Sequence, residues 1–201
     1  MNEDKKLEIL YDHYKDTFQH QIRYIENRNR YFFIALVLIA LLFFFIADPF
    51  VLSNAFGSIL KKEIGDSFLI DFAYVNNLLL FGLLWVLILY YQTNLSIEKQ
   101  YKYLAILEDD LTKSIQPFKI SREGKFWVGI KPTFAKWVSK IFKLFFPLCI
   151  AFAVAIKLFT EIFYEQKFKK LTFWVDFILC SVILIITILY TFWQNRGRKQ
   201  K

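Results

Sequence analysis

Ionisable side chains within otherwise apolar stretches are the residues of this chain whose types and spacing could carry chemistry. Lys157 and Glu161 are four residues apart in one apolar stretch, and Asp176 lies near the start of the next. Charged groups are costly inside a bilayer, and where they occur they are paired or mark a functional site. An intramembrane polar cluster is therefore expected, with Asn76 and Asn77 of an earlier apolar stretch as candidates for hydrogen bonds between helices.

This polar cluster has two interpretations. Its side chains line a polar opening, as in a channel or transporter subunit, or Lys157 extends its amino group to the outer headgroups and has no further role. All of the charges fall in the outer half of the expected spans and none near the centre of the bilayer. That placement argues against a proton relay or a dedicated ion transporter.

The other reactive residue types are not arranged for catalysis or metal binding. Cys149 and Cys180 lie in apolar stretches without CxxC spacing or a nearby histidine, and each is expected to be a small buried hydrophobic residue. His13 and His20 are too far apart along a helix to share one ion without another ligand. Consecutive acids at 108–110 point around a helix and are expected to form a solvated face. The sequence predicts no enzyme, no cofactor and no bound metal.

The composition indicates that most of the chain lies in a membrane. Of its 201 residues, 56% are apolar and 20% aromatic, whereas soluble domains are roughly 45–50% apolar. About 17–25 apolar residues cross a bilayer as a helix, which satisfies its own backbone polar groups. Tyr and Trp cluster at the ends of such segments, as expected at the headgroup level. The expected spans are 31–47, 72–91, 143–164 and 172–193.

Lysine and arginine are distributed unevenly around these spans. Twenty lie in the N-terminal segment, between the second and third spans or in the C-terminal tail, against five in the two remaining loops. Positively charged segments stay on the cytoplasmic side. Both termini are therefore expected in the cytoplasm, in a multi-pass protein of the cytoplasmic (inner) membrane whose hydrophilic first residues lack the pattern of a cleaved signal peptide. This arrangement leaves outer loops at 48–71 and 165–171 and a basic cytoplasmic tail at 194–201.

Two hydrophilic segments next to the spans carry apolar residues at helical spacing. In residues 1–30 these recur every three or four positions, and no proline or glycine precedes the end of the first span, so one helix should continue into it. A similar stripe follows the second span in residues 92–116, and Pro117 should end that helix. The two stripes should pair as an antiparallel hairpin, a cytoplasmic stalk. The expected seam places Leu7, Tyr11, Tyr14 and Phe18 against Tyr101, Leu104, Leu111 and Ile115.

The predicted fold is thus an all-α membrane protein with four transmembrane helices and cytoplasmic helical extensions that form a stalk hairpin. Residues 117–142 join the stalk to the third span and are basic and aromatic. Gly124 suits a turn, with a short strand hairpin beside it. After Thr133, apolar and basic residues separate onto different sides of a helix, which is typical of a helix in the membrane interface.

The basic and aromatic side chains of this region are expected to meet anionic inner-leaflet lipids, which attract lysine and arginine near the surface. A cytoplasmic protein partner is the alternative, and nucleic acid is disfavoured because the membrane location already explains the charge. The expected contact residues are Lys125, Phe126, Trp127, Phe134, Lys136, Trp137 and Lys140.

The layout of the chain resembles that of small multi-pass membrane proteins of bacterial anti-phage systems. The features that carry the resemblance are LEILYDHYKDTF in a helix running into the first span, four spans in all, and ISREGK in an inner-leaflet loop. The four-span accessory proteins of type VI-B CRISPR loci are the nearest comparison. The resemblance covers layout without a diagnostic catalytic motif, and it carries over no site residue. It implies a membrane-perturbing effector or a modulator of a cytoplasmic nuclease complex.

The function predicted from these features is that of a non-enzymatic integral membrane effector or accessory protein. It is expected to form homo-oligomers, to respond to a cytoplasmic partner and to perturb the membrane in antiviral defence. The alternative is a small channel or transporter subunit that uses the intramembrane polar cluster.

Overall fold

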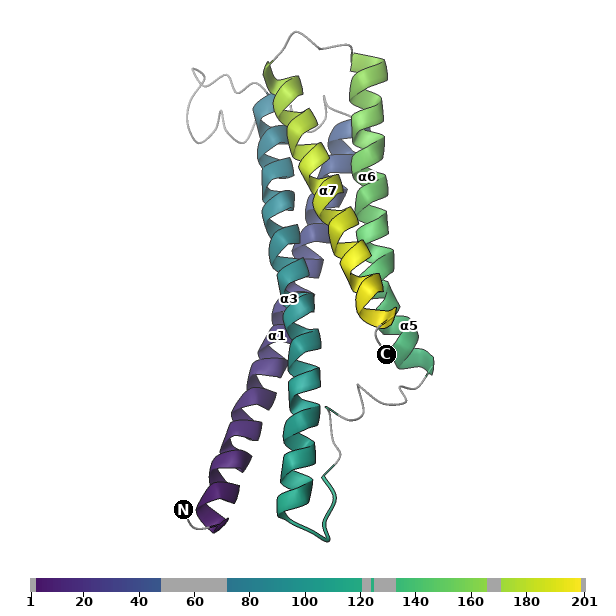
Figure 1. The fold of residues 1–201 in the computed structure, drawn as a ribbon. Coiled ribbons are helices and arrows are strands. Elements are labelled where there is room, and N and C mark those ends of the chain that lie inside the picture. The colour runs from purple at the N-terminus through teal and green to yellow at the C-terminus, as the bar shows by residue number, and fades with distance from the viewer. Residues whose placement is uncertain (1–2, 48–71, 121–123, 125–132, 166–170, 200–201) are drawn as a thin grey trace, which may run out of the picture. The chain divides into compact units, whose positions relative to one another are not determined.

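The computed structural model describes residues 3–47, 72–120, 124, 133–165 and 171–199, of which 96% are helical and none is in a strand. Four stretches of helix are long and apolar enough to cross a membrane, as predicted. The α-helices are α1 (Glu3–Ala47), α3 (Phe72–Ser114), α5 (Thr133–Lys140), α6 (Phe146–Thr160) and α7 (Leu171–Lys199), and the π-helices η1 (Ile141–Phe145) and η2 (Glu161–Glu165) flank α6 (Figure 1).

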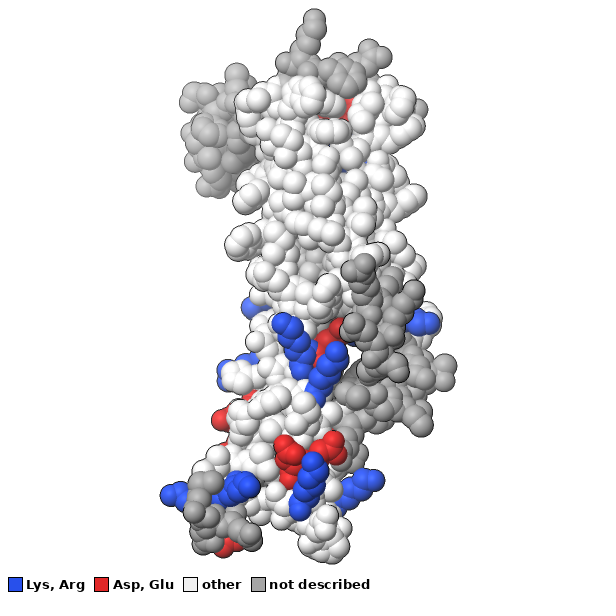
Figure 2. All heavy atoms as spheres, viewed as in Figure 1, with Lys and Arg blue, Asp and Glu red and all other residues white. Residues whose placement is uncertain are grey.

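The chain divides into two compact units. Unit 1 comprises Met1–Tyr31 and Leu89–Ile141, and unit 2 comprises Phe32–Ile88 and Phe142–Lys201. Figure 2 shows charged side chains gathered over the described surface of unit 1, whereas the visible face of unit 2 is almost uncharged. Each unit therefore has a surface suited to a different solvent.

In unit 1, the first part of α1 packs against the last part of α3. Tyr14 of α1 meets Glu108 of α3, whereas Arg28 lies within electrostatic range of Tyr90, so the two helices run in opposite directions. The core of this pair is Tyr14, Leu104, Leu107 and Leu111, with Leu7, Leu10, Phe18 and Ile120 packed against it.

The seam on α1 is shifted from the expected stripe. Tyr11 is 56% exposed, whereas Tyr14, Thr17 and Gln21 are buried. A spacing of three and four residues from Leu10 onward describes this seam, and it contains two polar residues that look like surface residues in the sequence. Thr17 satisfies its hydroxyl within α1, by donating to the His13 carbonyl at 2.7 Å.

Unit 2 has an apolar core drawn from all four of its helical segments. Ala35 of α1, Leu83 of α3, Ile150 of α6 and Ile183 of α7 are each almost completely buried. Large apolar side chains point outward on the same helices, as suits a unit whose solvent is lipid. Of the two free cysteines, Cys180 and Cys149, the first is buried as expected and the second is exposed.

Proline explains where two of the helical segments change. The α-helix of α3 ends at Ser114, close to the boundary expected before Pro117. Pro147 lies in the first turn of α6, and the wider π turn η1 ends directly before that helix. A proline has no N–H to donate to the preceding turn, and π turns occur where the α ladder is interrupted.

Candidate functional sites

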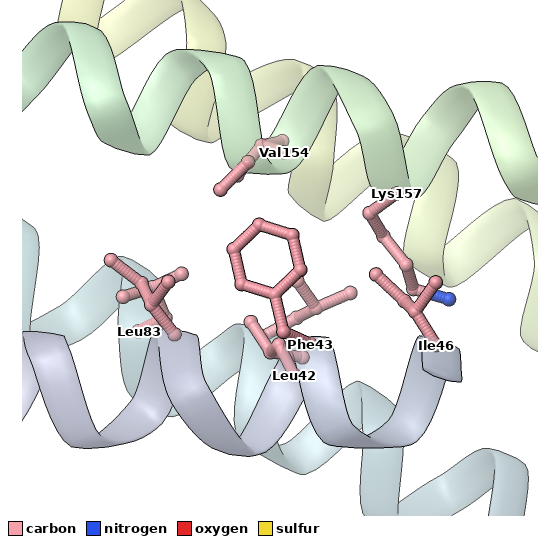
Figure 3. A pocket seen from close by; sticks show the side chains of 9 residues that line it. Leu42, Phe43, Ile46, Leu83, Val154 and Lys157 are labelled. Atoms are coloured by element: carbon pink, nitrogen blue, oxygen red, sulfur yellow. The ribbon is translucent and has the colours of Figure 1, made fainter. Parts of the chain in front are cut away.

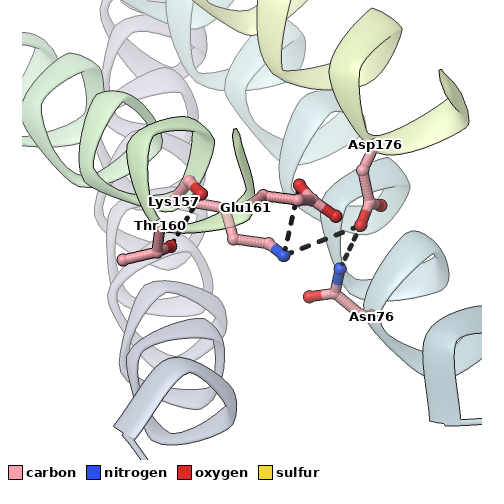
Figure 4. Close-up of polar contacts among 5 residues, drawn as sticks. All are labelled: Asn76, Lys157, Thr160, Glu161 and Asp176. Carbon is pink, nitrogen blue, oxygen red and sulfur yellow. Dashed lines mark hydrogen bonds and ion pairs between the residues drawn. The ribbon is translucent and has the colours of Figure 1, made fainter. Parts of the chain in front are cut away.

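The intramembrane polar cluster lies in unit 2 and brings together four of the five predicted residues. The Lys157 Nζ is 3.5 Å from Glu161 Oε2 and 3.6 Å from Asp176 Oδ2. Asn76 Nδ2 donates to Asp176 Oδ2 at 2.6 Å. Figure 4 shows these side chains converging from α3, from the end of α6 with η2, and from α7.

Burial makes these contacts strong. The Lys157, Glu161 and Asp176 side chains are only 12%, 8% and 5% exposed, so water screens their interactions weakly. The amine of Lys157 therefore remains inside the unit, bonded to two carboxyl groups. Of the two earlier interpretations, a paired cluster describes the geometry better than a lysine that reaches only to the headgroups.

Asn77 is the predicted member that the structure does not join to the cluster. It is partly buried, and its carbonyl oxygen has no hydrogen-bond partner among the described residues. Neighbouring residues on a helix point about 100° apart, so Asn76 and Asn77 cannot both face α7. The sequence marked the pair, and the helical rotation selects Asn76.

A small apolar cavity lies next to the cluster in unit 2. Its volume is about 10 Å³, and Figure 3 shows Leu42, Phe43, Leu83 and Val154 around it together with Lys157. A cavity needs about 10–15 Å³ of such volume, and polar partners, to hold a single water molecule. This cavity therefore has no room for a transported solute.

Glu108 forms a second site, in unit 1, which the sequence analysis assigned wrongly to a solvated acidic face. Its side chain is fully buried, and its Oε1 accepts the Gly124 N–H at 2.8 Å and the Tyr14 hydroxyl at 3.4 Å. Asp109, by contrast, is exposed. The signal that could have found this site is that Glu108 falls on the apolar stripe of α3, between Leu104 and Leu111.

The segment that follows α3 is held against that helix at two points. One is the bond from Gly124 to Glu108, and the other is at Thr112, whose Oγ1 accepts the Ile120 N–H at 3.1 Å. A Cβ atom on Gly124 would lie 2.3 Å from the Ala105 backbone nitrogen. Only glycine permits so close an approach of two backbones, so residue type and contact are matched. We call the Glu108–Gly124 contact the clamp.

The predicted lipid-facing residues are described only in part. Phe134 and Trp137 of α5 are 74% and 61% exposed, and Lys140 is exposed as well. Lys136 lies in the same helix. Lys125, Phe126 and Trp127 lie outside the described residues, as does most of the expected strand hairpin. The exposed pair of aromatic rings on α5 suits a membrane interface or a protein partner equally well.

Metal-binding geometry and relatives add no assignment. Among the described residues there is no group of three or more His, Cys, Asp or Glu side chains that could hold a metal ion. His13 instead makes a 2.6 Å hydrogen bond with the Tyr103 hydroxyl. No protein-family model, curated protein or solved structure matches the chain.

Proposed function

We propose that this chain is a non-enzymatic integral membrane effector or accessory protein that receives a signal through the paired ends of α1 and α3. In this proposal the pair is a cytoplasmic stalk, and the segment after α3 passes its state to α5 and the third span. The observation that supports the proposal is the clamp, because it ties that segment to both helices of the pair through Glu108.

The clamp suits signal transfer because it is sensitive to the packing of α1 against α3. Hydrogen bonds to charged groups contribute about 1.5–3 kcal/mol each, and their strength falls steeply with geometry. The Tyr14 hydroxyl is already at 3.4 Å from Glu108, at the long end of such bonds. A partner that moves α1 along α3 by a small distance would therefore strengthen or weaken the hold on Gly124.

The surrounding membrane supplies the second half of the proposal. With both termini in the cytoplasm, Phe134 and Trp137 lie at headgroup depth on the inner leaflet, and Lys140 meets anionic lipid. Homo-oligomers and a role in antiviral defence follow from the resemblance in layout. The trigger is then a cytoplasmic protein, and the response is a change in the membrane.

Membrane potential in bacteria that express the chain, with and without its neighbouring genes, tests this function. We expect a partner-dependent loss of potential for the wild type, and a response that is weaker or constitutive for Glu108→Ala. The matched control is Asp110→Asn, because Asp110 lies two residues away and pairs only at the surface with Lys113. If Glu108→Ala and the wild type respond identically at equal expression, the clamp does not transmit the signal.

Orientation requires its own experiment. A reporter active only in the cytoplasm, fused after Lys201, should be active. A second fusion at residue 58, in the predicted outer loop, should be inactive. A stably expressed but inactive fusion at Lys201 would refute the topology.

Lipid contact is tested with Lys136→Glu and Lys140→Glu together. Reversed charge should weaken attraction to vesicles that contain anionic lipid, and less so at high salt, because salt screens surface charges. Trp137 fluorescence, with the other tryptophans replaced by Phe, reports depth directly. Emission typical of full water exposure in membranes would remove α5 from the interface.

A small channel or transporter subunit is the second candidate, and the buried charges of the polar cluster favour it. The neighbouring cavity has room for at most one water molecule, so a transport path would require another conformation or several copies. Ion flux into vesicles that contain the purified chain distinguishes the candidates. Flux that Asp176→Asn abolishes would support the channel.

A further inference from the structure

We propose that the polar cluster of unit 2 binds one exchangeable proton, shared between the Glu161 and Asp176 carboxyl groups, in addition to the protons of the Lys157 ammonium. The inference concerns a site that the membrane-effector proposal does not use, and it is independent of that proposal. It starts from the charge balance: among the described residues of the cluster there is one amine and there are two carboxyl groups.

Geometry prevents the lysine from neutralising both acids fully. Its Nζ lies at 3.5 Å and 3.6 Å from the two carboxyl groups, whereas a charge-assisted N–H···O bond is about 2.7–2.9 Å long. One ammonium thus bridges two acids without a short bond to either. With both acids ionised, a net negative charge would remain in a site that is buried even before lipid surrounds it.

The oxygen atoms that have no donor show where a proton fits. Asp176 Oδ2 receives both the Asn76 amide and the lysine, whereas Asp176 Oδ1 is buried and has no hydrogen-bond partner among the described residues. The Asn76 carbonyl oxygen, in a residue that is 93% buried, is in the same situation. Protonating one carboxyl group removes the excess charge and converts an acceptor into a donor for these oxygens.

The surroundings provide no other described charge to balance the cluster. The neighbouring side chains from α1 are Phe43 and Ile46, which do not titrate, and α3 contributes the neutral Asn76. Cys180 of α7 lies within electrostatic range of the three charged groups, and ionising its thiol would add negative charge. A proton is therefore the smallest occupant that makes the site neutral.

Infrared spectroscopy of the purified chain in lipid vesicles at neutral pH tests the proposal, because a protonated carboxyl group has its own C=O band that shifts in D₂O. Relative to wild type, Asp176→Asn and Glu161→Gln should each lose one such band, since a single remaining acid pairs with the lysine. Lys157→Met should gain one, since both acids then become neutral. Asp110→Asn, at an exposed acid of unit 1, should change nothing.

Two results would overturn the proposal. One is that neither Asp176→Asn nor Glu161→Gln loses a carboxylic acid band, which would mean that both acids are ionised in the wild type. The other is that the wild-type band appears only after sodium is replaced by choline, which would assign the site to a small cation. The amide variants nearly preserve side-chain volume, so the test stands even if Lys157→Met fails to fold.

Discussion

Both units bury carboxyl groups, but they hold them in different ways. In unit 1, Glu108 receives a backbone N–H from Gly124 and a hydroxyl from Tyr14, which are both neutral donors. In unit 2, Glu161 and Asp176 share one ammonium. The first arrangement fixes the path of the chain, because a backbone N–H stays in place whatever the side chain. The second joins side chains of separate helices and depends on charge.

The difference teaches which properties each site is sensitive to. A carboxylate held by neutral donors needs an acceptor of the right shape, and an amide of equal size replaces it in part. A carboxylate held by an ammonium needs the opposite charge, and removing either partner leaves the other buried and uncompensated. The following substitutions therefore separate shape from charge.

Lys157→Met should have the largest effect. It leaves two acids in unit 2 without their ammonium, and breaking a buried ion pair costs about 3–5 kcal/mol of unfolding free energy. The cost should shrink as the pH is lowered, because protonation removes the uncompensated charge. Unfolding of the purified chain in detergent measures it, with Lys113→Met at a 74% exposed side chain as the control. Equal stabilities of the two variants would contradict the prediction.

Glu108→Ala should come next. It leaves the Gly124 N–H and the Tyr14 hydroxyl without their acceptor, at about 1–3 kcal/mol for each donor left unsatisfied. Glu108→Gln retains an acceptor oxygen and should recover much of the loss. Unfolding measurements on both variants show whether shape or charge matters at this site. If Gln is as damaging as Ala, Glu108 depends on its charge and the two sites are alike.

Gly124→Ala should disturb unit 1 without changing any polar group. The new methyl would meet the backbone of α3 at 2.3 Å, and overpacking of this kind costs about 1–3 kcal/mol. Gly82→Ala is the matched control in unit 2, since its Cβ would lie 4.0 Å from Leu38 Cδ1, which is ordinary contact. Alanine favours a helix over glycine by about 1 kcal/mol, so that variant should be as stable as wild type or more so. Cysteine cross-linking between residues 108 and 124 offers a second readout of the clamp.

The smallest effect separates the expected seam from the observed one. Phe18 is only partly buried against the core of unit 1, so Phe18→Ala should cost less than the 3–5 kcal/mol of a fully buried phenylalanine, about 1–3 kcal/mol. Tyr11→Ala, at an exposed position of the same helix, should change stability by less than about 0.5 kcal/mol. A larger cost for Tyr11 than for Phe18 would restore the stripe read from the sequence.

The polar cluster was predictable because its evidence is local. Charges inside apolar stretches are visible in the sequence, and the spacing of Lys157 and Glu161 places them on one face of a helix. The role of Glu108 was not predictable in the same way. Its burial depends on a glycine 16 residues later that folds back on α3, and nothing near Glu108 in the chain announces that contact. Local pattern instead groups Glu108 with the exposed Asp109.

The helices were predictable in extent but not in winding or in register. Apolar length and basic flanks locate the spans, whereas the choice of Thr17 over Phe18 for the buried seam follows from how α1 rotates against α3. Threonine is small and can satisfy its hydroxyl on the preceding turn, so it enters a seam that sequence patterns reserve for apolar residues. The two π turns likewise reflect hydrogen-bond choices that apolar periodicity does not record.

The π turn η2 gives the end of the third span a property of a different kind, which concerns insertions and deletions. A π turn holds one residue more than the α turn it replaces, so removing one residue from 161–165 would let the helix close as α while turning everything beyond it by about 100°. Lys157 and the residues before it would keep their orientation. Length variation of a single residue should therefore be tolerated here, at the edge of the charged cluster, far better than within the uninterrupted α-helix of α7.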